Sequence, residues 1–586
     1  MRFVSIALAT ASAFALATPG AAAPADDLNA VTDEYWAAYL RANPTYASQI
    51  GHREYDSKLG DVSLGEADRQ AELAARLLAR LNAIPEAGLS STDRTNKAIL
   101  KRTLESTVQG NRFGQRMMLF TNRSGWHQSL ADLADSLTFR SKADYENYLT
   151  RLAAYPALND ESLRVSTRAL TEGFVLPCAA MTGFDQTISG VIPADATKSR
   201  IYTPFAAERP ANISAADWSA LQGRARSLIE GDLRAAYAKH LDWYQNQYAP
   251  RCAKSAGVSS QPNGRAYYDW LIGQFTTTDL NADQIHALGL REVARIRADM
   301  EKVAKGAGFA TREAYIADLR TNPKYYANTP EELLEVTARE TKKIDGQMPR
   351  FFTLLPRLPY GLKEIPAETA AGTTTAYYNQ GSPEQGIAGF YFVNTTKLDQ
   401  RPLWEVPVLT VHEAVPGHHH QIALQQELPL PEWRRYGAYF TAFVEGWGLY
   451  SERLGIEMGL YDTPAKDMGR LSYQMWRATR LVVDTGMHAK GWSKEKAVAY
   501  MLDNTALSPA NIEAEINRYI ANPGQALAYK IGQLKIEELR ARAEQQLGAK
   551  FDVRRFHDAV LGQGSVPLDA LETQIDAWIA SERNRT

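Results

Sequence analysis

The sequence is poor in three things: cysteine, net charge and long apolar runs. It has 586 residues and only two cysteines, and 65 Lys and Arg against 67 Asp and Glu leave a formal net charge of -2. This balance gives no support to nucleic acid or an anionic membrane surface as the main partner. No apolar run after the first 25 residues reaches the length of a membrane span. We therefore expect no nucleic-acid partner and no membrane anchor in the mature chain.

The first 25 residues have the composition of an export signal. Arg2 precedes an apolar run over 3–17, which is too short to span a bilayer comfortably, and a helix break follows at Pro19 and Gly20. Small residues then suit cleavage within 22–25. We predict a cleaved signal peptide over residues 1–25 and a periplasmic or secreted protein. No cysteine follows the apolar run, which argues against a lipid-anchored form.

The two cysteines, Cys178 and Cys252, would enter an oxidising compartment on export. One disulfide between them is then a reasonable expectation. Their separation along the chain sets no geometry, so two separate buried thiols remain the alternative. Neither cysteine lies near a histidine motif, and we predict no catalytic role for them.

Most of the chain has helical periodicity. Apolar residues recur at three- and four-residue spacing over 66–84, over 214–248, and over a segment that begins after the capping residue Asn281. The exception is 372–397, where β-branched and aromatic residues alternate with turn residues, and 388–394 is the best strand. The pattern predicts a mainly α fold with a small β-sheet.

No repeat, low-complexity tract or long linker divides the mature chain. We expect a single domain over 26–586, with an N-terminal helical part at about 26–370 and a catalytic part at about 371–586. The predicted strands end just before a cluster of histidines. The edge of a small sheet at that place can hold an extended peptide by main-chain hydrogen bonds.

Four of the ten histidines fall within nine residues, in the stretch VHEAVPGHHHQ (411–421). A zinc-protease helix has histidine, then glutamate, and a second histidine at the fifth position. Here His412 and Glu413 fit the first two positions, but the fifth is Pro416. A solvated patch or ordinary core histidines are the alternative interpretation, which the neighbouring Glu413 makes weaker.

The second histidine ligand must be chosen between two candidates. His412 and His418 are six residues apart, which places them about 120° out of register on a regular helix. Pro416 and Gly417 lie between them and favour a local break, which would return His418 to the ligand position. His419 is nearly in register, but its Cα would lie about 10.5 Å from that of His412. We predict His418 and keep His419 as the alternative.

A third ligand is expected from the next helix. If the chain folds back at about residue 430, His418 lies about 18 Å, Glu445 about 22 Å and His412 about 27 Å from the turn. Glu452, at about 33 Å, lies beyond them. Glu445 is also embedded among aromatic residues, where an unpaired carboxylate is costly. We therefore predict Glu445 as the third metal ligand.

The ligand role of Glu445 has an alternative, and Glu413 has a predicted role of its own. Glu445 could instead form a salt bridge with an arginine such as Arg477 or Arg480. Glu413 follows the first ligand and points to another side of the helix, where a carboxylate can act as the general base of a hydrolysis. Three protein ligands with an open position are typical of catalytic zinc.

The sequence resembles a known family. HEAVPGHHHQ, FVEGWGLYSE, RLVVDTGMHAKGW and NPGQALAYKIG are similar to the motifs of the domain of unknown function 885, a bacterial group placed among gluzincin-type zinc peptidases. The resemblance covers almost all of the mature chain. Dipeptidyl peptidase III resembles this case in having an insertion within its histidine motif. Angiotensin-converting enzyme and thimet oligopeptidase, which are related helical peptidases, have helical shells around a deep channel.

The resemblance implies a site that agrees with the geometric argument. It implies zinc bound by His412, His418 and Glu445, with Glu413 as catalytic base. It also implies a large helical shell around a deep cleft, with the small sheet next to the zinc-binding helix. Tyr529 in the last motif would hydrogen-bond the oxyanion as gluzincin tyrosines do. A core tyrosine is the equal alternative.

Three further residues in these motifs have weaker indications. Lys530 could attract a substrate carboxylate, although it and its neighbour Tyr529 cannot both face the zinc. His488, four residues after Asp484, could donate a hydrogen bond to a carboxylate next to the metal ligands, or it could bind substrate. A plain pair on a helix surface is at least as good an interpretation.

The predicted function is a zinc-dependent hydrolase, a metallopeptidase that cleaves short peptides. A zinc hydrolase of non-peptide amides would use the same ligands, and an aminopeptidase would differ from a carboxypeptidase only in the substrate terminus that it holds. A peptide-binding protein with a vestigial metal site is the third rival. The sequence does not indicate the oligomeric state.

Overall fold

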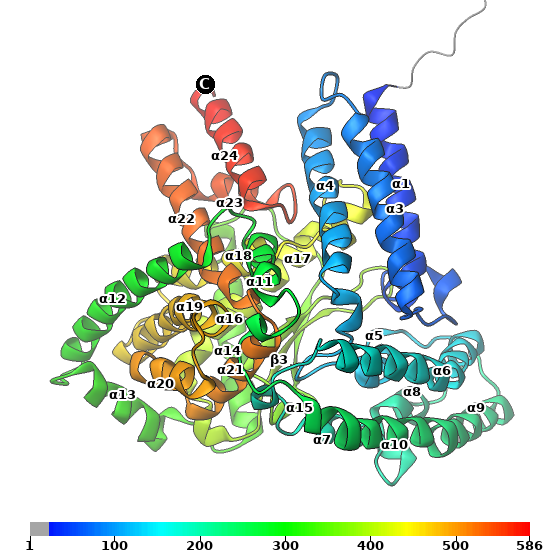
Figure 1. The fold of residues 1–586 in the computed structure, drawn as a ribbon. Coiled ribbons are helices and arrows are strands. Elements are labelled where there is room, and N and C mark those ends of the chain that lie inside the picture. Colours follow the sequence, from blue (N-terminus) through cyan, green and yellow to red (C-terminus); the bar gives the residue numbers. More distant parts are fainter. Residues whose placement is uncertain (1–22, 586) are drawn as a thin grey trace, which may run out of the picture.

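The computed structural model describes residues 23–585, and most of them are helical (Figure 1). The predicted mainly α fold with one small sheet is confirmed. The predicted signal peptide over residues 1–25 lies almost entirely outside the described residues. Within the described part of the chain, no helix is both long and apolar enough to cross a membrane.

The helices before the first strand are α1 (Pro24–Ala42), α2 (Pro44–Gln49), α3 (Leu64–Ala83), α4 (Ser91–Arg112), α5 (Ser129–Ser136), α6 (Lys142–Glu172), α7 (Phe184–Ser189), α8 (Thr203–Ala206), α9 (Ala215–Leu228), α10 (Arg234–Trp243), α11 (Gly264–Thr276), α12 (Ala282–Gly306), α13 (Arg312–Thr321) and α14 (Pro330–Asp345). The later ones are α15 (Ala367–Ala370), α16 (Val406–Glu413), α17 (His418–Glu427), α18 (Thr441–Glu457), α19 (Pro464–Lys490), α20 (Lys494–Asn504), α21 (Pro509–Ala521), α22 (Ala528–Leu547), α23 (Val553–Leu561) and α24 (Leu568–Arg583).

The sheet has three short strands, β1 (Tyr360–Glu364), β2 (Ala376–Asn379) and β3 (Gly389–Val393), in the order β1-β3-β2. β3 lies within the predicted strand. It pairs parallel with β1 and antiparallel with β2. β1 was not predicted, because the five residues YGLKE offer little alternation and two of them are charged. β2 is left as an edge strand.

The two predicted parts share a core. Helix α12 is capped as predicted, since the side chain of Asn281 accepts a hydrogen bond of 3.0 Å from the backbone N–H of Gln284. Its buried face, which includes Ile296 and Met300, packs along α19. Because α12 precedes residue 370 and α19 follows it, packing crosses the boundary between the two parts.

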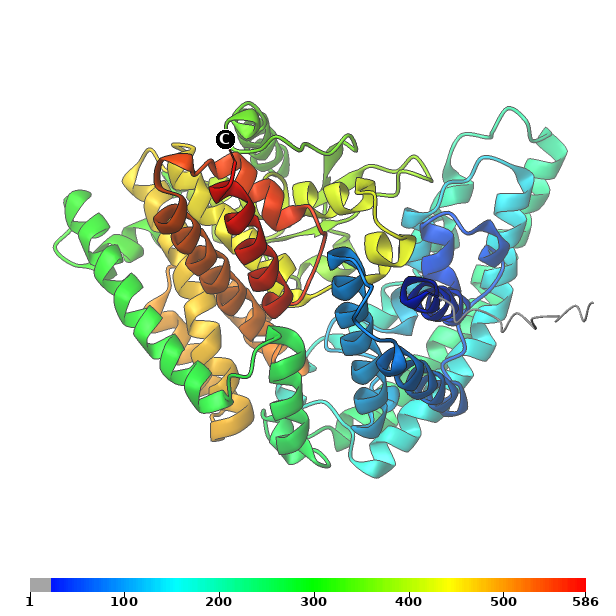
Figure 2. The same cartoon turned by 90° about the horizontal axis from the view of Figure 1, so that it is seen from above.

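The N-terminal helices form one side of the molecule and the C-terminal helices the other (Figures 1 and 2). In Figure 1 the blue and cyan helices α1 to α6 lie on the right and the orange and red helices on the left. Apolar residues of α1, α3 and α4 nevertheless share one core cluster with residues of α18, α22 and α24. The segment from Phe120 to Tyr248 has its own apolar cluster. Cys178 in this segment and Cys252 just after it form a disulfide, which decides the alternative left open by the sequence.

Candidate metal centre

The histidine motif is split between two helices. α16 ends at Glu413 and α17 begins at His418, so the residues around Pro416 and Gly417 form a break in place of a helical turn. A β-carbon on Gly417 would overlap the carbonyl oxygens of His412 and Val411, so only glycine fits there. The predicted interruption is therefore present: the helix ends, the chain turns, and a new helix begins.

The break is held in place by the next helix. The indole Nε1 of Trp447 on α18 donates a hydrogen bond of 2.7 Å to the carbonyl oxygen of Pro416. Trp447 is fully buried and lies two residues after Glu445. The same helix that carries the predicted third ligand thus fixes the backbone that separates the first two.

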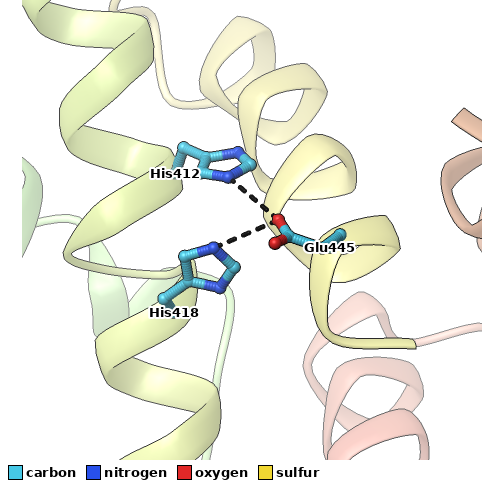
Figure 3. A group of neighbouring side chains, drawn as sticks. All are labelled: His412, His418 and Glu445. Atoms are coloured by element: carbon cyan, nitrogen blue, oxygen red, sulfur yellow. Dashed lines mark ion pairs between the residues drawn. The ribbon is translucent and has the colours of Figure 1, made fainter. Parts of the chain in front are cut away.

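The three predicted metal ligands lie together (Figure 3). Oε2 of Glu445 is 3.5 Å from Nε2 of His412 and 3.3 Å from Nε2 of His418. One ligand atom from each of the three residues lies within 4.8 Å of the others, and all three residues are buried. In the part of the chain that the structure describes, no other group of this kind is present.

These separations fit a metal ion. Two ligand atoms that are each about 2.1 Å from a tetrahedral zinc lie about 3.4 Å apart, close to the two distances between Glu445 and the histidines. Two imidazoles and a carboxylate are a donor set typical of catalytic zinc. The predicted salt-bridge alternative for Glu445 is absent among the described residues, because Arg477 pairs with Glu452 and Arg480 pairs with Glu515.

The charges of the three side chains support one another. Burial acts to raise the pKa of Glu445, but the two histidines outweigh it and hold that pKa well below its usual range. Burial acts to lower the pKa of His412, whereas hydrogen bonding to Glu445 and Glu452 raises it to about 9. The carboxylate of Glu445 therefore stays ionised, as a ligand of a metal cation must be.

A further carboxylate, Glu452, supports the first ligand from behind. Its Oε1 lies 2.9 Å from Nδ1 of His412, on the ring nitrogen that does not face Glu445, and 3.1 Å from Nη2 of Arg477. A carboxylate on the outer nitrogen of a ligand histidine fixes the ring and its tautomer. The sequence argument excluded Glu452 as a ligand but did not predict this role. Its signal was the spacing of seven from Glu445, nearly two turns on one face.

Two glycines on α18 allow neighbouring groups to approach the helix closely. A β-carbon on Gly448 would lie 2.7 Å from Cε1 of His412, so the ligand ring rests against bare backbone. A β-carbon on Gly446 would lie 2.5 Å from the carbonyl carbon of Gly532 on α22. α18 is thereby held against both the first ligand and the helix that carries Tyr529.

The alternative ligand His419 lies outside this centre. Its Nδ1 is 3.0 Å from the hydroxyl oxygen of Tyr378, and its Nε2 is 3.0 Å from the carbonyl oxygen of Leu358. Both ring nitrogens thus have partners on the side of the sheet. His420 is fully buried against the ring of Phe352, at a centroid distance of 4.5 Å. The geometry brings His418, and not His419, to His412.

The predicted catalytic residues line the same cavity as the three ligands. Glu413 and Tyr529 are both on its wall, and burial, with a further contribution from Glu445, raises the pKa of Tyr529. Its phenol therefore stays protonated and can donate a hydrogen bond. Tyr439, which the sequence argument missed, is 58% exposed and also lines this cavity. Its position six residues before Glu445 was the available signal.

The remaining motif residues are structural. His488 accepts a hydrogen bond of 3.0 Å from the backbone N–H of Val258, and Asp484 accepts one of 2.6 Å from the hydroxyl of Tyr268. Both are fully buried, so the surface-pair interpretation is wrong. Nζ of Lys530 lies 3.2 Å from Oε2 of Glu292, within the protein and away from the cavity.

The cavity at the centre has a volume of about 360 Å³ and is bordered by the edge strand β2. A second cavity of about 660 Å³ adjoins it, and the two share Arg123, Arg518 and part of β2. The second one reaches the N-terminal side at residues 121–124 and α5. Together they form a cleft between the two sides of the molecule. A volume of this size suits a small ligand or a short peptide, since small-molecule sites start at roughly 300 Å³.

One family model matches most of the chain. The family described as bacterial protein of unknown function (DUF885) matches residues 44–575, and the chain belongs to this family. The resemblance read from the motifs is thereby confirmed as far as the family is concerned. No curated protein matches the chain.

Solved structures share the fold. A presumed lipoprotein from Colwellia psychrerythraea is 27% identical, with a TM-score of 0.87, over 95% of this chain and 100% of its own. A presumed lipoprotein of unknown function from Shewanella oneidensis is 19% identical, with a TM-score of 0.68, over 94% of this chain and 99% of its own. The second match extends the fold to a distant relative.

Proposed function

We propose that the protein is an exported zinc metallopeptidase that cleaves short peptides. The observation that carries the proposal is the convergence of His412, His418 and Glu445 on one point in the wall of a cavity that also contains Glu413. A zinc ion held by these three residues would supply a Lewis acid that polarises the substrate carbonyl and activates water. The presumed lipoprotein relative and the disulfide support export, because disulfides persist in oxidising compartments.

Glu413 provides the proton transfer. It directly follows the first ligand at the end of α16, and its carboxylate lines the cavity. No hydrogen bond or salt bridge to its side chain occurs among the described residues, so the group is available to a water molecule. It can accept the proton of the attacking water and pass it to the leaving amine.

Tyr529 and Tyr439 stabilise the charge that develops on the carbonyl oxygen. Both line the cavity from elements on either side of Glu445, one on α22 and one just before α18. A protonated phenol that is positioned before the reaction is an effective donor to an oxyanion. The edge strand β2 offers main-chain groups that can pair with an extended substrate.

The test is Glu413→Gln, loaded with zinc, against a panel of short peptides. Loss of a general base lowers the rate by about 100-fold to 10,000-fold, while the three ligands and hence the bound zinc remain. Glu427→Gln is the matched control, because Glu427 lies on α17 outside the cavity, 3.2 Å from Nε of Arg357.

Cleavage by the wild-type protein and by Glu427→Gln, with little by Glu413→Gln, supports the proposal. Failure of the zinc-loaded wild-type protein to cleave any peptide would count against it. Full activity of Glu413→Gln would exclude the assigned base.

A further inference from the structure

The cavity that holds the metal centre has a strongly cationic wall. The arginines that line it are Arg123, Arg477, Arg480 and Arg518. Arg477 is used by the metal centre, since its Nη2 pairs with Glu452 at 3.1 Å. The other three surround a single carboxylate, that of Glu515.

Glu515 cannot neutralise three guanidinium groups. Its Oε2 is 2.8 Å from Nη2 of Arg480 and 2.8 Å from Nη2 of Arg518, and Oε1 accepts a further bond of 3.1 Å from Arg518. Arg123, on the loop before α5, interacts with Glu515 only through its charge. The cluster therefore keeps a net charge of two positive units, beside the carboxylates of the metal centre.

Two guanidinium nitrogens of this cluster have no partner in the part of the chain that the structure describes. Nη1 of Arg480 and Nη1 of Arg123 are buried and make no hydrogen bond within the described residues. Arg480 is 2% exposed, and the ring of Tyr529 covers its guanidinium at 4.2 Å. Burial, together with the charge of Arg518, also lowers the pKa of Arg123. Buried donors and uncompensated positive charge both favour an anionic ligand.

The edge strand β2 indicates in which direction a bound peptide chain would run. Thr374, just before β2, donates a hydrogen bond of 3.0 Å to Oδ1 of Asn511 on α21, the helix that carries Glu515 and Arg518. This helix thus starts beside the beginning of β2, and Thr374 lines both cavities together with Arg123 and Arg518. A chain that pairs antiparallel with β2 runs in the opposite direction, so its C-terminus lies beside that beginning. A parallel chain would place its N-terminal ammonium there, against like charge.

We propose that Arg123, Arg480 and Arg518 bind the C-terminal carboxylate of the peptide substrate, so that the protein acts from the C-terminus of short peptides. This inference rests on the proposed peptidase function. A planar guanidinium matches the two oxygens of a carboxylate, and Nη1 of Arg480 and of Arg123 are the free donors. An internal peptide segment has no main-chain charge to offer at this point.

The experiment measures binding and cleavage separately. One pentapeptide without acidic side chains is prepared with both ends free, with the N-terminus acetylated, and with the C-terminus amidated. Binding of each form to zinc-loaded Glu413→Gln is measured by calorimetry. Amidation is expected to weaken binding by about tenfold to 100-fold, the effect of losing a charge-assisted hydrogen bond, while acetylation leaves the affinity unchanged.

Arg123→Gln in the same background tests the site itself. Arg123 forms no ion pair among the described residues, so its removal leaves no buried carboxylate there without a partner and the fold is expected to persist. The variant should lose most of the difference between free acid and amide. Arg112→Gln is the control, because it removes an exposed positive charge at the end of α4, outside the cavity.

Equal affinity for the free acid and the amide in Glu413→Gln would overturn the proposal. An amidated peptide ending in glutamate that binds as tightly as the free acid would overturn the terminal assignment in favour of a side-chain carboxylate. If the zinc-loaded wild-type protein cleaves no form while Glu413→Gln still prefers the acid, the peptidase function fails and the carboxylate site stands. If the wild-type protein cleaves both the free acid and the amide, and Glu413→Gln binds them equally, the peptidase function stands and the carboxylate site fails.

Discussion

At the scale of single residues, the centre depends on how His412 is held. One ring nitrogen faces Glu445 and the other faces Glu452, which is fully buried and paired with Arg477. The imidazole is therefore held from both sides. Such an arrangement would orient His412 as the proposed ligand and raise its basicity.

Glu452→Gln is expected to weaken zinc binding by about 10-fold to 100-fold, because the outer partner of a ligand histidine tunes its basicity and orientation. The measurement is zinc affinity by competition with a chelator. Glu457→Gln on the same helix is the control, since Glu457 pairs with Arg540 away from the cavity. Equal zinc affinity in the two variants would show that Glu452 has only a structural role.

The limits of the sequence argument are clear at this scale. The residue types and spacing of His412, Glu413 and Glu445 were sufficient to predict that they lie together. Glu452 was placed too far along the helix because a straight hairpin about residue 430 was assumed. In the structure α18 begins only at Thr441, and a further turn at Trp433–Gly437 precedes it.

At the scale of elements, close helix packing sets the distance between Glu445 and Tyr529. Gly446 on α18 and Gly532 on α22 face each other, and a β-carbon on Gly532 would overlap the carbonyl oxygen of Ala442. Each glycine lies within three residues of one of the two functional side chains. The two helices can therefore present Glu445 and Tyr529 to one cavity.

Gly532→Ala is expected to lower the free energy of unfolding by about 1–3 kcal/mol, because the added methyl group must push α18 and α22 apart. Gly273→Ala is the matched control: Gly273 is also helical, and a β-carbon there meets nothing within 4 Å. That variant should be stabilised by about 0.5–1 kcal/mol. Denaturant unfolding of both proteins gives the comparison, and equal shifts would contradict the account of the helix contact.

The elements were predictable where the periodicity was strong. The helix after Asn281 and the strand over 388–394 were both found from pattern and capping. β1 was missed because its pairing with β3 comes from tertiary packing, which a five-residue segment does not encode on its own. The shape of the break at Pro416 and Gly417 depends on the hydrogen bond from Trp447, a contact between helices that spacing along one helix does not contain.

At the scale of the molecule, the cleft needs both sides of the chain. The three proposed metal ligands come from α16, α17 and α18, whereas Arg123 reaches the same cavity from the N-terminal side. The segment that begins with Cys178 packs against α21, the helix that carries Glu515 and Arg518. The disulfide thus belongs to the region that holds the cationic wall in place.

Replacing both Cys178 and Cys252 by serine is expected to lower the free energy of unfolding by about 4 kcal/mol, since the bond closes a loop with a sequence separation of 74. The bond lies outside the metal centre, so zinc content should not change. Thermal unfolding with and without reductant, beside metal analysis, measures both. An unchanged transition would show that the bond does not constrain the unfolded chain.

The central claim is that His412, His418 and Glu445 hold a zinc ion. The most direct measurement is the metal content of zinc-loaded wild-type protein beside His412→Ala, His418→Ala, Glu445→Ala and the control His419→Ala. We predict stoichiometric zinc in the wild type and in His419→Ala, and loss in the other three. Undiminished zinc in His418→Ala with loss in His419→Ala, or no zinc in the wild type, would contradict the account.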